Sequence, residues 1–232
     1  MKPRLRLESL TPFAAVLLTA GMALAHGDVA PQPVNTDALP DVGEEWLIEN
    51  PYRDMGDDVW SAAIDIGSSG YNQNCARCHG LEVVSGGLAP DLRFLEAEEF
   101  GDEWYVERFQ NGYTQNGTTM MPAFGELLGQ KAAWAIRTYI ETRPDQDTIE
   151  GFYPDLRDAR DSLASLADAG EASPEAEAIK EQLVEIASQV ETLSGAPIAD
   201  SIAFRAANQI SAEPASYKRA AETLTVGLPV AH

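Results

Sequence analysis

The sequence predicts an all-α fold in two helical parts, and three observations carry this prediction. Candidate helices follow one another along most of the chain, with acidic residues, serine or proline at their starts and glycine or proline at their ends. No segment alternates convincingly with the period of two that marks a half-buried strand. A single short motif at residues 75–79 contains both cysteines of the chain.

The first 25 residues have the features of a secretory signal peptide. Three basic residues occur among the first six positions, and an apolar run follows from residue 13 to residue 24. An A-x-A sequence ends at Ala25, so we expect cleavage there and a mature chain that begins at His26. An uncleaved anchor is the alternative, although the run is short for a bilayer. We expect an exported protein, periplasmic in a bacterium, with no membrane span after cleavage.

Residues 26–56 are predicted to form an extended N-terminal arm. They are rich in proline, aspartate and glycine, which disfavour regular structure. We expect this arm to wrap the domain that follows, with Trp46, Ile48 and Tyr52 as docking residues.

Residues 57–144 are predicted to form a small helical domain. Its first helix starts at Asp57 and continues into the motif at 75–79, with an interruption expected near Gly67 and Gly70. A domain this small has a marginal core of its own, so a buried cofactor would supply missing apolar surface. Further helices are expected over 102–109 and 126–142, and loops over 80–90 and 114–119.

Residues 145–232 are predicted to form an acidic helical extension, as a helical hairpin or small bundle. Three helices are expected, over 155–169, 174–193 and 198–210, and Pro214 is interpreted as a breaker after the last of them. Apolar residues recur at helical spacing in the second helix, and we interpret this stripe as a packing face. Its members are Ile179, Leu183, Ile186, Val190 and Leu193.

The charge is strongly acidic along the whole chain. Lys and Arg number 16 against 37 Asp and Glu, a net charge of -21. Residues 26–144 contribute -13 and residues 145–232 contribute -10, so the bias does not come from one tail. Nucleic acid is therefore excluded as a partner, and a protein with a positive surface is favoured. The alternative is that the acidity only keeps the protein soluble.

The motif Cys75-Ala76-Arg77-Cys78-His79 is typical of covalent haem attachment. Each thiol would bind one vinyl group of the porphyrin, and His79 would supply an axial nitrogen to the iron. A zinc site needs about four ligands, and the other histidines lie at the ends of the mature chain. A redox dithiol usually accompanies a βαβ pattern, which this sequence lacks. We therefore expect one covalent haem c.

A six-coordinate haem iron needs a second axial ligand, and we choose Met121. A methionine thioether is typical of electron-transfer cytochromes, where it raises the reduction potential. Met121 lies in a predicted loop before the last helix of the domain, and Pro122 holds that loop extended. Met120 is the alternative ligand. An iron closed by two ligands favours an electron carrier, not an enzyme.

These residues together resemble a class I cytochrome c. The resemblance covers residues 57–144 and rests on three stretches. The first is the sequence around Cys75 to Gly80, the second is Ala89-Pro90-Asp91-Leu92, and the third is Met121-Pro122-Ala123-Phe124. It implies the class I fold around one haem. It also implies that the carbonyl of Pro90 accepts a hydrogen bond from His79, which would hold the proximal ring.

A closer resemblance includes the arm. Residues 26–32, Asn50-Pro51-Tyr52-Arg53 and residues 86–93 are similar to c-550 cytochromes that serve periplasmic PQQ-dependent alcohol dehydrogenases. This implies that the protein takes electrons from a quinoprotein dehydrogenase and passes them to a downstream cytochrome or oxidase. The chain departs from that pattern by continuing past residue 144. Two alternatives stay open: a subunit docked permanently to a larger dehydrogenase or oxidase, and a haem sensor with a labile methionine.

Overall fold

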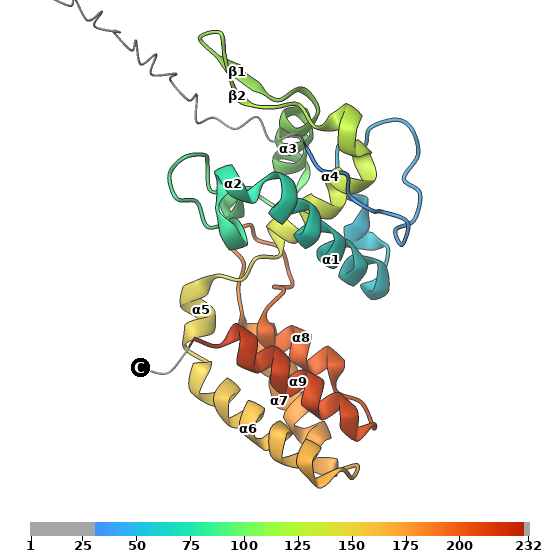
Figure 1. Ribbon diagram of the computed structural model, residues 1–232, viewed down its shortest axis with the longest axis vertical. Helices are drawn as coiled ribbons and strands as arrows, with labels where there is room; N and C mark the ends of the chain where they lie inside the picture. Colours follow the sequence, from blue (N-terminus) through green and yellow to red (C-terminus); the bar gives the residue numbers. More distant parts are fainter. Residues whose placement is uncertain (1–30, 230–232) are drawn as a thin grey trace, which may run out of the picture. The chain divides into compact units, whose positions relative to one another are not determined.

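The computed structural model describes residues 31–229 (Figure 1). The predicted signal peptide, its cleavage site and His26 lie outside the described residues. The described chain is mostly helical, which confirms the all-α prediction apart from one hairpin. Its α-helices in the first part are α1 (Asp57–Asn74), α2 (Ala76–His79), α3 (Glu99–Asn111) and α4 (Gly125–Glu141). None of the helices in this described range is long and apolar enough to cross a bilayer.

The buried hydrophobic residues form two separate clusters. The first cluster contains buried residues between Leu39 and Ile140, and the second contains buried residues between Ile149 and Leu228. Burial of apolar side chains is the main favourable contribution to folding, so each cluster is a separate source of stability. The exact domain boundaries at 56/57 and 144/145 stay a prediction.

The N-terminal arm lies against the first cluster along part of its length. The Tyr52 side chain, in the short 3-10 helix η1 (Pro51–Asp54), is fully buried, and Trp46 packs against Phe109 with ring centroids 6.3 Å apart. The predicted docking role of Ile48 is wrong. Its side chain is 54% exposed and both neighbours are exposed too, because this stretch of the arm faces solvent.

Helix α1 runs without a break through Gly67 and Gly70, so the predicted interruption is wrong. The two glycines instead allow α1 to pack closely on α4 (Figure 1). A Cβ atom added at Gly67 would lie 1.9 Å from the carbonyl oxygen of Ala135, and one at Gly70 would lie 3.0 Å from Ile136. Glycine is needed here because the two helix backbones leave no room for a side chain.

Replacing Gly67 with alanine is expected to lower the free energy of unfolding. Alanine improves helix propensity, but its methyl group would force the α1 and α4 backbones apart, and overpacking of this kind costs about 1–3 kcal/mol. Urea denaturation followed by tryptophan fluorescence measures the change. Gly86→Ala is the matched control, because a Cβ atom there meets no atom within 4 Å. Equal stability of the two variants would show that the close approach is not needed.

The predicted loop over 114–119 is a β-hairpin. Strand β1 (Tyr113–Gln115) pairs antiparallel with β2 (Thr118–Met121), with a register irregularity between Tyr113 and Thr114. Asn116 and Gly117 form the turn with φ angles of 51° and 78°. Asn-Gly is the preferred pair when both turn residues need positive φ. This turn therefore closes the hairpin although its two strands lack alternating hydrophobic residues.

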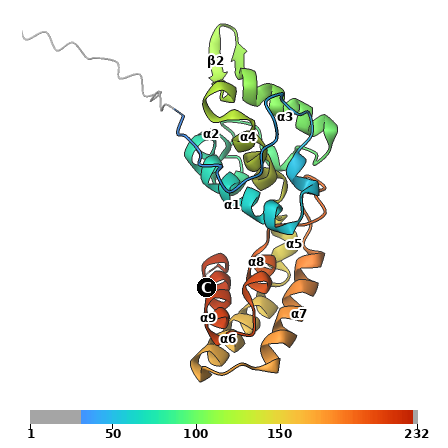
Figure 2. The same cartoon turned by 90° about the vertical axis from the view of Figure 1, so that its right-hand side faces the viewer.

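The extension has five helices in the described residues, where the sequence predicts three (Figure 2). They are α5 (Gln146–Glu150), α6 (Tyr153–Ala169), α7 (Pro174–Gln189), α8 (Ile202–Gln209) and α9 (Pro214–Gly227). The interpretation of Pro214 as a breaker is wrong, because proline is also favoured in the first turn of a helix and here it begins α9. Helices α6 to α9 pack side by side as a small bundle.

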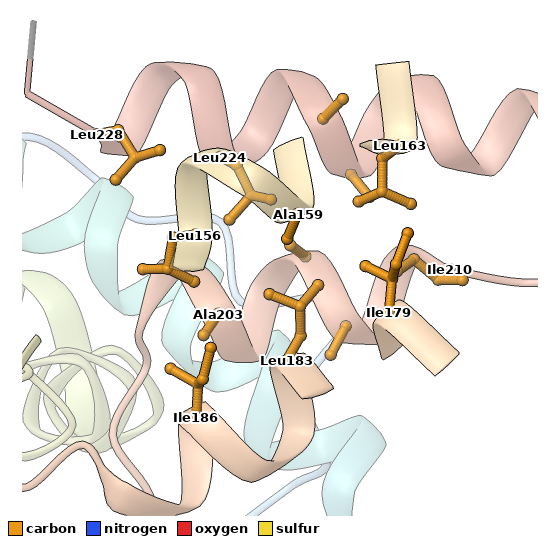
Figure 3. Close-up of a cluster of buried hydrophobic side chains, with 14 of the residues drawn as sticks. Leu156, Ala159, Leu163, Ile179, Leu183, Ile186, Ala203, Ile210, Leu224 and Leu228 are labelled. Carbon is orange, nitrogen blue, oxygen red and sulfur yellow. The ribbon is translucent and has the colours of Figure 1, made fainter. Parts of the chain in front are cut away.

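The second cluster fills the space between these helices. Figure 3 shows Leu156 and Leu163 of α6, Leu183 of α7 and Leu224 of α9 pointing toward a common centre, and all four are fully buried. The stripe on α7 is a packing face as predicted, since its first four members are buried. Leu193 lies beyond the end of α7 at Gln189 and is only half-buried.

A buried ionic cluster joins the arm to α3 and α4. The carboxylate of Asp102 accepts hydrogen bonds from the guanidinium of Arg53 at 2.6 and 2.9 Å and from Nε of Arg137 at 2.7 Å. Arg53 also contacts Glu141 with Nη2 and Oε2 2.6 Å apart. The Asp102 and Arg137 side chains are fully buried, so this cluster fixes the arm through charges shielded from water.

Candidate functional site

The predicted attachment motif occupies a single helical turn. Helix α1 ends at Asn74, Cys75 follows it, and α2 carries the motif to His79. The amide of His79 donates to the carbonyl of Cys75 at 2.9 Å, which places His79 one turn after the first cysteine. Gly80 then turns the chain with a φ of 86°, and a Cβ atom there would lie 1.9 Å from the carbonyl oxygen of Val84. Only glycine fits this tight reversal.

The ring of His79 is oriented by Pro90. Nδ1 of His79 lies 2.9 Å from the carbonyl oxygen of Pro90, and the histidine is 9% exposed. A carbonyl oxygen only accepts, so Nδ1 carries the hydrogen and donates it. The neutral imidazole then keeps its lone pair on Nε2, which is the nitrogen left for a metal ion.

The loop that carries Pro90 is itself held by polar contacts. The carboxylate of Asp91 accepts hydrogen bonds from the Arg93 guanidinium at 2.7 and 3.0 Å and from the amide of Ser85. The Arg93 guanidinium lowers the pKa of the Asp91 carboxyl below its ordinary value because it stabilises the ionised form. The Ser85 hydroxyl also donates to the carbonyl of Ala89. Pro90 is thus fixed from both sides.

The hydroxyl of Tyr71 supports the turn after His79 and was missed by the sequence analysis. It donates to the carbonyl of Gly80 at 2.9 Å, and its ring lies 5.4 Å from that of Tyr139. Burial raises the pKa of Tyr71, so this hydroxyl stays a donor. The spacing of four between Tyr71 and Cys75 is a helical signal that could have identified it.

The two cysteines differ in their surroundings. Cys75 packs against the first hydrophobic cluster, whereas Cys78 is exposed. Burial raises the pKa of the Cys75 thiol to about 12, because the thiolate is disfavoured away from water. A redox-active dithiol needs a lowered pKa, so this environment opposes that alternative. Within residues 31–229, no three His, Cys, Asp or Glu side chains gather as a metal site.

The two candidate methionines lie in different environments on β2. Met121 is half-buried and packs against the first cluster, whereas Met120 is 57% exposed. Successive residues of a strand point to opposite sides, which accounts for the difference. Gly112, with a φ of 68°, holds this end of the hairpin close to α3, since a Cβ atom there would lie 2.5 Å from the carbonyl oxygen of Met121. The sequence analysis missed this role of Gly112.

The predicted site residues come from three segments: the motif at residues 75–79, the loop with Pro90, and β2. His79 and Pro90 are in direct contact, and Cys75 and Met121 border the same hydrophobic cluster although 46 positions separate them in the sequence. The arrangement offers two thiols, one oriented imidazole nitrogen and one thioether, and of these the Cys75 thiol and the Met121 thioether border apolar side chains. That set of donors suits a covalently attached haem with a soft axial ligand.

Known proteins resemble this chain over its first part. The family model described as cytochrome c oxidase, cbb3-type, subunit III matches residues 62–140. Cytochrome c550 of Pseudomonas aeruginosa is 51% identical over 136 residues, which cover 59% of this chain and 92% of that relative. Quinohemoprotein alcohol dehydrogenases ADH-IIG and ADH IIB of Pseudomonas putida are each 31% identical, over 39% and 36% of this chain and 12% of their own lengths. No solved structure shows significant similarity.

Proposed function

Since the chain belongs to the cytochrome c550 family, and is thus an electron-transfer protein and not an enzyme, we propose that it carries single electrons from a quinoprotein alcohol dehydrogenase toward the respiratory chain. The observation that carries this proposal is the match to almost the whole length of a cytochrome c550. We further propose that it acts in the periplasm after cleavage at Ala25. Residues 57–144 would form the cytochrome domain and residues 145–232 an added extension.

We propose that one haem c is held by five residues. Cys75 and Cys78 would form the thioether bonds, His79 and Met121 would be the axial ligands, and the carbonyl of Pro90 would orient His79. A haem bound here supplies one-electron chemistry at its iron. The protein's own contributions are the fixed ring of His79, the apolar surroundings of Met121 and the exclusion of water by the first cluster. The half-buried position of Met121 against the first cluster favours it over the exposed Met120.

The quinoprotein donor is supported by two observations. The similarity to two quinohemoprotein alcohol dehydrogenases covers 12% of each, so a short part of those enzymes resembles this chain. The acidic charge of residues 26–232 favours a donor with a positive docking surface. The acceptor would be a downstream cytochrome or oxidase, reached by the same charge-steered association.

Reduction of the oxidised protein by a purified PQQ-dependent alcohol dehydrogenase tests the donor. We expect fast reduction in a stopped-flow experiment when alcohol is present, and a rate that falls as ionic strength rises, because salt screens attraction between opposite charges. The control omits the alcohol. Absence of reduction, or a rate that rises with salt, would contradict the proposed partner. Co-elution of the two proteins at high salt would instead favour a permanently docked subunit.

A further inference from the structure

Arg143 links the extension to the loop that follows His79. Its guanidinium lies between two carboxylates: Nη1 is 3.2 Å from Oε2 of Glu82, and Nη2 donates to Oδ2 of Asp200. The Arg143 and Asp200 side chains are 7% and 2% exposed, whereas that of Glu82 is 70% exposed. One buried arginine thus connects the extension to a residue three positions after His79.

The aromatic ring and backbone carbonyl of Tyr139 hold Arg143 in place. Its guanidinium carbon lies 3.9 Å from the centroid of the Tyr139 ring, and its Nε donates to the Tyr139 carbonyl at 2.9 Å. The Tyr139 hydroxyl also donates to Glu82, at 3.3 Å. Cation–π contact of this kind is stronger when the cation is shielded from water. Arg143 and Tyr139 therefore act on Glu82 together.

The loop on which they act has an unfavourable backbone conformation. Glu82 and Val83 are consecutive residues with φ angles of 53° and 65°, and Val83 is fully buried. A β-branched residue rarely adopts positive φ, so neighbouring contacts must stabilise this conformation. Here Glu82 is contacted by Tyr139, near the C-terminal end of α4, and by Arg143. Arg143 is in turn contacted by Asp200.

Asp200 is well placed to position Arg143. Its carboxylate accepts hydrogen bonds from Nε and Nη2 of Arg205 at 2.6 and 2.8 Å, and its amide donates to the carbonyl of Thr142 at 2.8 Å. Arg205 also reaches Asp65 of α1, with Nη1 and Oδ1 3.2 Å apart. Asp200 is thus anchored by its carboxylate to Arg205 of the extension and by its amide to Thr142 at the end of α4.

We propose that the extension fixes the proximal loop of the cytochrome: Asp200 positions Arg143, and Arg143 holds Glu82 and the turn at residues 80–84. Arg143 is then a positioning residue for the segment that carries His79. The loop part of this inference stands on the described contacts alone, while its effect on the iron rests on the proposed function. Loss of either carboxylate charge would raise the reduction potential, because the oxidised iron is the more positive state.

Amide hydrogen exchange in the full-length, haem-loaded protein tests the loop part. The amides of Gly80 and Val84 are hydrogen-bonded, to Ala76 and Leu81, and report the opening of this turn. We expect Glu82→Gln and Asp200→Asn each to accelerate their exchange at least tenfold. The double variant should exchange no faster than the faster single variant, because both substitutions break one linked set of contacts.

The reduction potential tests the link to the iron. Each single variant is expected to change the equilibrium constant for reduction about threefold in favour of the reduced form, or roughly 28 mV at 59 mV per tenfold. Asp161→Asn is the charge-matched control. It also removes one carboxylate charge that pairs with an arginine, but Asp161 is on α6 and its partner is Arg160. Asp65→Asn is the second control, because it loosens Arg205 but leaves the contact of Asp200 with Arg143.

Four outcomes would overturn the proposal. The first is unchanged amide exchange at Gly80 and Val84 in Glu82→Gln, a variant whose exposed side chain rules out misfolding as the explanation. The second is additive acceleration of exchange in the double variant, and the third is equal acceleration in Asp65→Asn. The fourth is a reduction potential that changes as much in Asp161→Asn as in Asp200→Asn. If the iron lacks the proposed axial ligands while the exchange pattern holds, the proposed function fails and the positioning role of Arg143 stands.

Discussion

Replacing Asp102 with asparagine is expected to lower the free energy of unfolding by about 3–5 kcal/mol, the cost of removing one partner from a buried ion pair. Asp102 is fully buried and accepts hydrogen bonds from Arg53 and Arg137. Without its charge, Glu141 would be the one carboxylate among residues 31–229 that both guanidinium groups contact. Urea denaturation measured by tryptophan fluorescence reports the loss, and proteolysis before residue 56 reports release of the arm.

Asp161→Asn is the control for this effect. It removes the same charge from an aspartate that also pairs with a neighbouring arginine, but on the exposed surface of α6. Surface ion pairs contribute little to stability, so no measurable change is expected there. If Asp102→Asn were as stable as Asp161→Asn, the buried ionic cluster would not be what holds the arm to α3 and α4.

Replacing Met121 with histidine is expected to lower the reduction potential on the order of 100 mV or more, within the roughly 0.8 V range that axial ligands span. The substitution would exchange a soft thioether, which favours the reduced iron, for an imidazole nitrogen. A redox titration of the haem-loaded protein measures the shift, and its absorption spectrum shows whether the iron keeps two axial ligands.

Met120→His is the matched variant on the same strand. Met120 is 57% exposed and lies on the opposite side of β2, so its replacement is expected to leave the potential nearly unchanged. The reverse result, a lowered potential in Met120→His and none in Met121→His, would identify Met120 as the ligand. That outcome would select the alternative that the sequence leaves open.

Local spacing predicts the parts of the site that lie within one turn of the chain. The interval from Cys75 to His79 determines their relative placement, because a helical turn sets the distance between them. The helices are predictable for the same reason, since caps and periodicity are local signals. The helix predictions fail where one residue type can play two structural roles. Gly67 permits close packing and does not break α1, and Pro214 begins α9 instead of ending a helix.

Contacts between distant segments could not be predicted in this way. Arg53 and Asp102 are 49 positions apart, and Arg143 and Asp200 are 57 apart. Periodicity describes which face of a helix is buried, but not which charged side chains of two buried faces meet. The hairpin at Asn116-Gly117 is a different case, because its turn signal is present in the sequence while its strands lack alternation.

The extension differs from an appendage that only adds negative charge. Trp60 of α1 meets Phe204 of α8 edge to face with ring centroids 5.5 Å apart, and the amide of Ala97 donates to the carbonyl of Ser194 at 2.9 Å. These contacts, like that of Asp200 with Arg143, join the extension to the first part of the chain. The extension is therefore placed to act on the cytochrome part itself.

The absorption spectrum of the oxidised, haem-loaded protein tests the central claim most directly. Coordination of iron(III) by a methionine thioether gives a weak band at the red edge of the visible spectrum. We expect this band in the wild type and in Met120→Ala, and its loss in Met121→Ala. A wild-type spectrum without the band, together with ready binding of carbon monoxide by the reduced protein, would contradict an electron carrier closed by His79 and Met121.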